Sequence, residues 1–194
     1  MSWKDVTLKQ FMELQELLKI EDETDRLLAV AELLLGEEVV DLPIAEFTKR
    51  VREIDFIKNP LPDEAPQKKI EVNGRKYNVD CLLGNIKTGQ YIDYINHGNS
   101  GDFAKMLSVF LIPEGHKYND GYDMEEVFSD INDLPITFVN SAAFFFARQF
   151  KTFIQIFQRY SIKQLKKMKI DKQTKKSMIE VLDKSMDMAL SRLS

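Results

Sequence analysis

The chain has 194 residues, 44% of them apolar and 30% charged, so it can bury a core as one domain or as two small lobes. Its formal charge of −4 gives no reason by itself to expect binding to nucleic acid or to a membrane. Cys81 is the only cysteine, which excludes an intramolecular disulfide. One cysteine and two separated histidines also lack the ligand spacing of a structural metal site.

The charge is distributed unevenly along the chain. Residues 1–146 contain 15 Lys and Arg against 27 Asp and Glu, whereas residues 147–194 contain 12 against 4. An acidic body of net charge −12 is therefore followed by a basic segment of net charge +8. Separated fields of opposite sign steer association between macromolecules, and this pattern predicts an interaction module.

Local signals predict helices from the start of the chain. Thr7 and Gln10 form a capping-box pair, which predicts a helix over about 7–19. Apolar residues at helical spacing predict a second helix over 27–35, and Gly36 is placed to end it. We expect these two helices to pair as a hairpin.

The tetrapeptide Asp-Leu-Pro-Ile occurs at 41–44 and again at 133–136. In both places we expect the aspartate to be an N-cap and the proline to lie in the first turn of a helix. The first of these helices completes a three-helix lobe over residues 1–58. Three prolines within 59–67 then predict an extended connector.

The strongest local signal is Asn73-Gly74 between two short alternating runs, within residues 68–81. Both turn positions of a type I′ β-turn need positive φ, which Asn and Gly tolerate, so the pattern predicts a β-hairpin. We expect Cys81 to be a small buried residue on its second strand.

Helical patterns return after the hairpin. Thr88 and Asp102 are expected caps of two helices, the second ending at Pro113. A turn-rich loop over 114–122 follows, and Asp123 is placed to cap the next helix. Together these elements form an expected lobe over residues 68–160.

The longest expected helix follows the second Asp-Leu-Pro-Ile and carries a phenylalanine stripe. Four phenylalanines at positions i, i+4, i+7 and i+11 share one face of this helix: Phe146, Phe150, Phe153 and Phe157. We interpret the stripe as buried core, with a groove for a partner as the alternative. Arg148 and Lys151 interrupt this apolar stretch, so it is not expected to span a membrane, and the N-terminus does not resemble a signal peptide.

Residues 161–194 form a basic tail with a methionine-rich amphipathic helix over about 172–192. Its lysines, together with residues of the 114–122 loop, are the candidate partner contacts: Lys163, Lys166, Lys167, Lys169, Lys172, Lys175, Lys176, His116, Lys117, Tyr118 and Tyr122. The preferred contact is with an acidic protein partner or with the chain's own acidic body. Nucleic acid is the alternative, and it is less favoured because arginine and aromatic residues are not interleaved with the lysines.

Catalytic motifs are not evident. Ser100 lies near His97 in sequence, and His116 is the other histidine, but no strand–turn–helix context surrounds the serine. Neither standard glycine-rich phosphate loop occurs. We therefore expect no catalytic, cofactor-binding or metal-binding residues, no cofactor, and a non-enzymatic role.

Three segments carry a resemblance to a known class of protein: WKDVTLKQFMELQEL, NGRKYNVDCLLGNIKTGQYIDY and IPEGHKYNDGYDMEEV. They resemble small proteins encoded in the structural gene blocks of tailed bacteriophages, namely tail-assembly-chaperone-like and other head- or tail-associated proteins. The resemblance implies a morphogenesis role in the cytoplasm of a bacterial host, and leaves open whether the protein stays in the virion. The implied partners are other phage structural proteins or further copies of the chain.

The expected fold is mainly α (α+β), with helical lobes and one β-hairpin. The expected function is contact with other proteins during phage assembly or within the virion.

Overall fold

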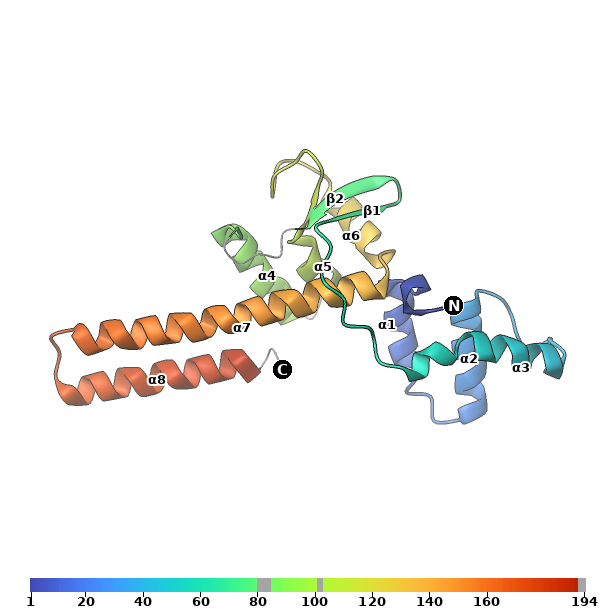
Figure 1. Cartoon of the computed structure of the whole chain (residues 1–194), viewed down its shortest axis with the longest axis horizontal. Coiled ribbons are helices and arrows are strands. Elements are labelled where there is room, and N and C mark those ends of the chain that lie inside the picture. Colours follow the sequence, from blue (N-terminus) through green and yellow to red (C-terminus); the bar gives the residue numbers. More distant parts are fainter. Residues whose placement is uncertain (80–84, 101–102, 192–194) are drawn as a thin grey trace. The chain divides into compact units, whose positions relative to one another are not determined.

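In this computed structural model, the described residues are 1–79, 85–100 and 103–191. The fold is mainly helical with a small antiparallel sheet, which confirms the predicted fold class (Figure 1). The chain divides into two compact units: residues 1–80 with 86–143, and residues 81–85 with 144–194. We call them unit 1 and unit 2. The lobe boundaries expected from the sequence remain predictions.

Unit 1 begins with three α-helices and two short 3₁₀ helices. Their bounds are η1 (Trp3–Asp5), α1 (Leu8–Leu17), α2 (Glu23–Leu35), α3 (Ile44–Glu53) and η2 (Asp55–Lys58). The capping box of α1 is confirmed, because the Thr7 and Gln10 side chains each accept a hydrogen bond from the other residue's backbone N–H, at 3.2 and 3.0 Å. Gly36 ends α2 in the left-handed conformation, with φ +70°, also as predicted.

The expectation for Asp41 is wrong. Helix α3 begins at Ile44 with Pro43 in the N-cap position, and no side chain caps it. Asp41 lies two residues before that cap, and the N-terminal N–H groups of a helix are reached from the N-cap position itself.

The expectation for Asp133 is wrong as well. Asp133 is the C-cap of the preceding helix, and Pro135 pairs with Thr7 in an isolated antiparallel β-bridge. Two backbone hydrogen bonds of 2.8 Å flank this bridge, from Leu8 to Leu134 and from Ile136 to Val6. The second Asp-Leu-Pro-Ile therefore pairs the N-terminal segment with the start of the helix that begins at Ile136. This pairing is a tertiary contact, so the four residues alone do not predict it.

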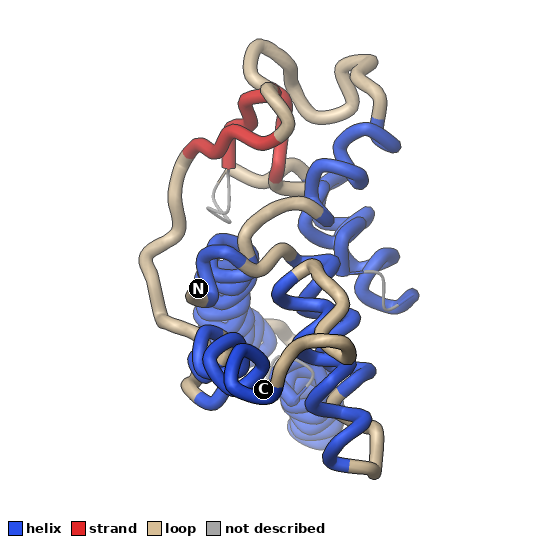
Figure 2. The backbone as a smooth tube through the Cα atoms, turned by 90° about the vertical axis from the view of Figure 1, so that its right-hand side faces the viewer, coloured by secondary structure: helices blue, strands red, loops and turns tan. Residues whose placement is uncertain are grey.

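The sheet contains three antiparallel strands in the order β1-β2-β3 (red in Figure 2). They are β1 (Lys69–Val72), β2 (Arg75–Val79) and β3 (Leu111–Pro113). Val72 lies opposite Arg75, and the two turn residues Asn73 and Gly74 have φ +51° and +75°. The predicted β-hairpin is therefore confirmed for its described residues, while Cys81 lies outside them.

Unit 1 contains three further whole helices within the described residues: α4 (Thr88–Ser100), α5 (Phe103–Ser108) and α6 (Met124–Asn132). Asp123 caps α6 as predicted, accepting from the Glu125 N–H at 2.8 Å. Thr88 is the first residue of α4 rather than its cap. The expected cap Asp102 lies outside the described residues.

Helix α5 ends at Ser108 and not at Pro113 as predicted. Residues Leu111–Pro113 instead pair with Val79, Asn78 and Tyr77 of β2, forming the third strand. A run of three residues is too short to show the alternation of apolar and polar residues that predicts a strand. Its pairing partner, β2, is also distant in the sequence.

The core of unit 1 joins the sheet, α5 and α6 to the N-terminal helices. Its largest fully buried side chains are Tyr77, Phe110, Leu8, Leu14, Ile54, Leu111, Ile131 and Leu134. Helices α1 and α2 contact each other, and α5 contacts both α4 and α6.

The longest helix described, α7 (Ile136–Lys167), begins in unit 1 and supplies most of unit 2 with α8 (Lys172–Ser191). The two helices lie antiparallel (Figure 1), and Gln158 donates to Asp183 at 2.8 Å across them. The side chains of the phenylalanine stripe at 146, 150, 153 and 157 lie outside those described. None of the helices within the described residues is long and apolar enough to cross a membrane.

The turn of the β-hairpin gives a first testable prediction. Gly74→Ala should lower the free energy of unfolding by about 1 kcal/mol, because an L-residue is strained at φ +75° even though open space surrounds this position. Gly89→Ala, within α4 and equally uncrowded, should instead raise it by about 0.5 kcal/mol. Urea unfolding measures both; equal effects would contradict the assigned turn.

Candidate functional site

Among the described residues of unit 1, the Asp130 side chain is a buried charged group. Asp130 lies on the buried face of α6 together with Val127 and Ile131, and its side chain is 1% exposed. A buried charge is costly unless it is paired and hydrogen-bonded. Asp130 must therefore find its partners within the protein.

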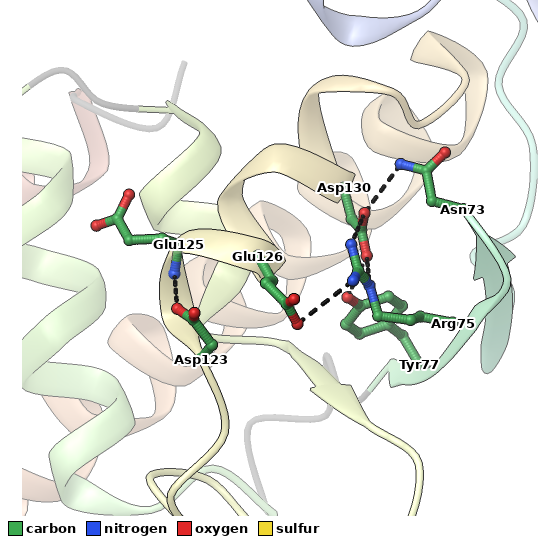
Figure 3. A network of polar contacts seen from close by, with 7 residues as sticks. All are labelled: Asn73, Arg75, Tyr77, Asp123, Glu125, Glu126 and Asp130. Carbon is green, nitrogen blue, oxygen red and sulfur yellow. Dashed lines mark hydrogen bonds and ion pairs between the residues drawn. The ribbon is translucent and has the colours of Figure 1, made fainter.

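The β-hairpin supplies these partners (Figure 3). Arg75 donates to both carboxylate oxygens of Asp130, from Nε and from a terminal nitrogen, each at 2.6 Å. The Tyr77 hydroxyl donates at 2.5 Å, and the Asn73 amide donates at 2.9 Å. Alternating residues of one strand and its turn thus converge on one carboxylate.

Electrostatics follow from this geometry. Hydrogen bonds from Arg75, opposed by desolvation, lower the pKa of Asp130 to about 2. Burial, reinforced by the hydrogen bond to Asp130, raises the pKa of Tyr77 above its ordinary value. Asp130 is thus held as an anion whose oxygens are already occupied, and its chemical effect is to fix the hairpin on α6.

A pocket of about 500 Å³ lies beside this network in unit 1. Arg75 borders it and pairs with Glu126 at 3.3 Å. Two predicted contact residues, His116 and Tyr122, also line it, and their rings meet edge to face with centroids 5.8 Å apart.

The structure separates the four predicted residues of the loop. His116 and Lys117 are exposed, whereas Tyr118 is half-buried and donates a 2.6 Å hydrogen bond to Asp93 of α4. Burial, followed by this hydrogen bond, raises the pKa of Tyr118. Tyr118 therefore anchors the loop to α4, and the surface available to a partner is formed by His116 and Lys117.

The seven predicted lysines cluster where α7 and α8 meet, at the tip of unit 2. Three belong to the end of α7, one to the connection, and three to the start of α8: Lys163, Lys166, Lys167, Lys169, Lys172, Lys175 and Lys176. Lys176 forms a long 3.9 Å ion pair with Glu180, and Lys175 donates to the Lys166 carbonyl at 3.3 Å. Within the described residues, Lys176 is the one lysine of the seven that forms an ion pair.

An apolar groove runs between the two helices beside these lysines. We call it the hairpin groove; its volume is about 620 Å³, and its lining is Tyr160, Ser161, Gln164, Leu165, Met168, Ser177, Met178, Val181, Leu182 and Ser185. Tyr160 and Val181 are 59% and 65% exposed. From 158 to 185, where every side chain is described, none is buried.

The lysines at the start of α8 oppose helix stability. A helix N-terminus carries partial positive charge, so cations in its first turn are unfavourable. Asp171 offsets part of this cost, since it accepts from the Thr174 N–H at 2.9 Å, and hydrogen bonds from Thr174 lower its pKa. The helix dipole therefore does not explain why Lys172 and Lys175 are in the first turn, whereas Lys176 lies beyond it and pairs with Glu180.

The serine and histidine residues considered as a catalytic set lie on two elements, and the side chain of Ser100 is outside those described. His97 and Ser100 belong to α4, whereas His116 lies in the loop against Tyr122. Among the side chains that the structure describes, no group of three His, Cys, Asp or Glu residues is placed to hold a metal ion.

Sequence reasoning missed the Asp130 network and the hairpin groove. A signal for the first was present, because a carboxylate at an apolar position of an amphipathic helix requires a buried donor. The groove had a weaker signal in the methionine-rich face of the final helix.

No family model matches the chain, and neither a curated protein nor a solved structure does. The resemblance to phage morphogenesis proteins therefore stays a prediction.

Replacing the buried carboxylate tests its structural role. Asp130→Asn should lower the free energy of unfolding at neutral pH by about 3 kcal/mol, because an amide cannot accept both Arg75 hydrogen bonds or balance its charge. Asp133→Asn is the matched control: Asp133 also accepts from Asn73, at 2.9 Å, but is exposed. It should change stability by less than about 0.5 kcal/mol. Equal losses in urea unfolding would contradict the buried network.

The low pKa of Asp130 predicts a specific acid sensitivity. Since this pKa falls from 3.8 to about 2 on folding, the ionised carboxylate stabilises the fold above about pH 4. This contribution, about 2 kcal/mol, is lost as the pH falls from about 4 towards 2. Thermal unfolding across this range should show a steeper loss for the parent chain than for Asp130→Asn. Parallel pH profiles would contradict the prediction.

Proposed function

We propose that this chain is a non-enzymatic bacteriophage assembly or virion-associated protein that acts through protein–protein contacts. It is either tail-assembly-chaperone-like or a small head, neck or tail subunit, and it works in the cytoplasm of the bacterial host during assembly. The observation that carries the protein-binding role is the hairpin groove with its adjacent lysines.

The groove has the character of a protein-binding surface. Exposed side chains of Tyr160, Met168, Met178 and Val181 lie within a short stretch of two adjacent helices. Grouped apolar exposure of this kind marks interaction sites, whereas single exposed apolar residues do not. Methionine adapts its shape to an irregular partner, which suits a groove that receives a helix or an extended segment.

The lysines specify the charge of the partner. Six of the seven have no ion pair within the described residues, so an acidic surface can approach without displacing existing ion pairs. A protein segment with an apolar face and flanking carboxylates satisfies both the groove and the lysines. Such charge complementarity increases the association rate and selects the partner.

Nucleic acid fits this surface less well. Proteins bind single strands by stacking bases on aromatic rings and by contacting phosphates with lysine and arginine. Among the described residues that line the groove, Tyr160 is the one aromatic residue, and the others have aliphatic, methionine or small polar side chains. The net charge of −12 on the rest of the chain also repels phosphates.

Co-purification tests the proposal. The tagged full chain is expressed in a bacterium in which a phage carrying this gene replicates, and recovered proteins are identified by mass spectrometry. The test variant combines Val181→Ser with Lys166→Gln and Lys167→Gln, all at exposed positions. Recovery of a phage structural protein should fall about tenfold or more, because both the apolar and the charged contacts weaken.

Val40→Ser is the matched control, since Val40 is 66% exposed and Val181 is 65% exposed. It should leave recovery unchanged. Equal recovery with all three proteins would remove the groove from the proposal. If the co-purified proteins are no longer recovered after nuclease treatment, the nucleic-acid alternative would be favoured instead.

A further inference from the structure

An apolar groove is also present in unit 1, where the end of α1 meets α2, α3 and η2. We call it the acidic groove; its volume is about 440 Å³, and its lining is Leu18, Glu23, Thr24, Arg26, Leu27, Leu28, Val30, Phe47 and Ile57. Leu18 and Leu27 remain 47% and 39% exposed. The described helices around this groove therefore leave large apolar side chains in water.

Three carboxylates are sequence neighbours of the lining residues Glu23, Thr24 and Arg26, near the turn between α1 and α2. Glu21, Asp22 and Asp25 are exposed and form no ion pair in the described part of the chain. Asp22 is the N-cap of α2, where its side chain accepts from the N–H groups of Thr24 and Asp25. Two neighbouring carboxylates, Glu16 and Glu23, are paired with nearby cations, at 2.7 and 3.7 Å.

The two grooves are complementary in charge. All 27 Asp and Glu residues of the acidic body belong to unit 1, where they outnumber 15 Lys and Arg, whereas unit 2 has 12 Lys and Arg against 4 Asp and Glu. A symmetric contact between two hairpin grooves would place +8 against +8. A contact between unlike grooves brings lysines and carboxylates that form no ion pair within the described residues towards one another, with apolar side chains on both sides.

We propose that the hairpin groove of one copy docks on the acidic groove of a second copy, so that the chain assembles with itself through a heterologous interface. This inference rests on the proposed function, because it names the partner of the hairpin groove. Each copy keeps one groove of each kind free after the first contact. Such an interface therefore propagates into a ring or an open chain of subunits.

Two full-length variants test the interface. The hairpin variant combines Val181→Ser with Lys166→Glu and Lys167→Glu. The groove variant combines Leu27→Ser with Glu21→Gln and Asp25→Asn, and a milder version omits the Leu27 change in case that change perturbs folding. Circular dichroism and thermal unfolding check that all of them fold, and light scattering after size-exclusion chromatography measures mass against concentration at low and high salt.

The parent chain should increase in mass with concentration at low salt and lose about tenfold or more in affinity at high salt, because the contact includes several charge pairs. Each variant alone should be monomeric. An equimolar mixture of the two should form dimers and nothing larger, since one intact groove of each kind remains between them. Val40→Ser should assemble like the parent chain.

Several results would overturn the inference. A parent chain that is monomeric at all concentrations and salt conditions would do so, and so would a groove variant that still dimerises, because that dimer would use hairpin grooves alone. If the parent chain is monomeric but co-purification still depends on the hairpin groove, the proposed function stands while the second copy is wrong as the occupant. If the parent chain is monomeric and co-purification does not depend on the hairpin groove, the proposed function is wrong as well.

Discussion

The architecture of unit 1 depends on the need to satisfy one buried anion. Asp130 is shielded from water on α6, so its lone pairs must be occupied by protein donors. Asn73, Arg75 and Tyr77 supply them, and all three come from the β-hairpin. This fixes the register of β2 on α6, and β3 pairs with β2 in turn. The hydrogen bonds to Asp130 thus connect two segments that lie 53 residues apart in the sequence, from Tyr77 to Asp130.

The parts of the fold that the sequence predicts are those determined by a few neighbouring residues. The capping box at Thr7, the left-handed Gly36 and the Asn73-Gly74 turn each depend on backbone geometry within one turn of the chain. Asp-Leu-Pro-Ile is different: a helix begins at the isoleucine in both places, but neither aspartate is its N-cap, and at the second place the proline also forms a β-bridge. Tertiary pairing decides the second case, so no local pattern distinguishes the two.

The same division applies to the candidate surfaces. The seven lysines were predicted because charge can be counted along a sequence, and the helical pattern of residues 172–192 placed three of them on one helix. The Asp130 network and both grooves depend on which segments pack together, and spacing in the sequence does not give this. Tyr118 illustrates the limit: it was a candidate contact, but a hydrogen bond to Asp93 commits it to the fold.

The two units treat polar and apolar groups in opposite ways. Unit 1 buries a carboxylate and surrounds it with donors, which favours one arrangement of its elements. Between 158 and 185, unit 2 leaves apolar side chains exposed and places lysines against the dipole of α8. Both features reduce the stability of an isolated helical pair, and a partner that is apolar and acidic reverses both penalties at once. The proposed association accounts for a surface with this composition, and the acidic groove is the proposed partner surface on a second copy of the chain.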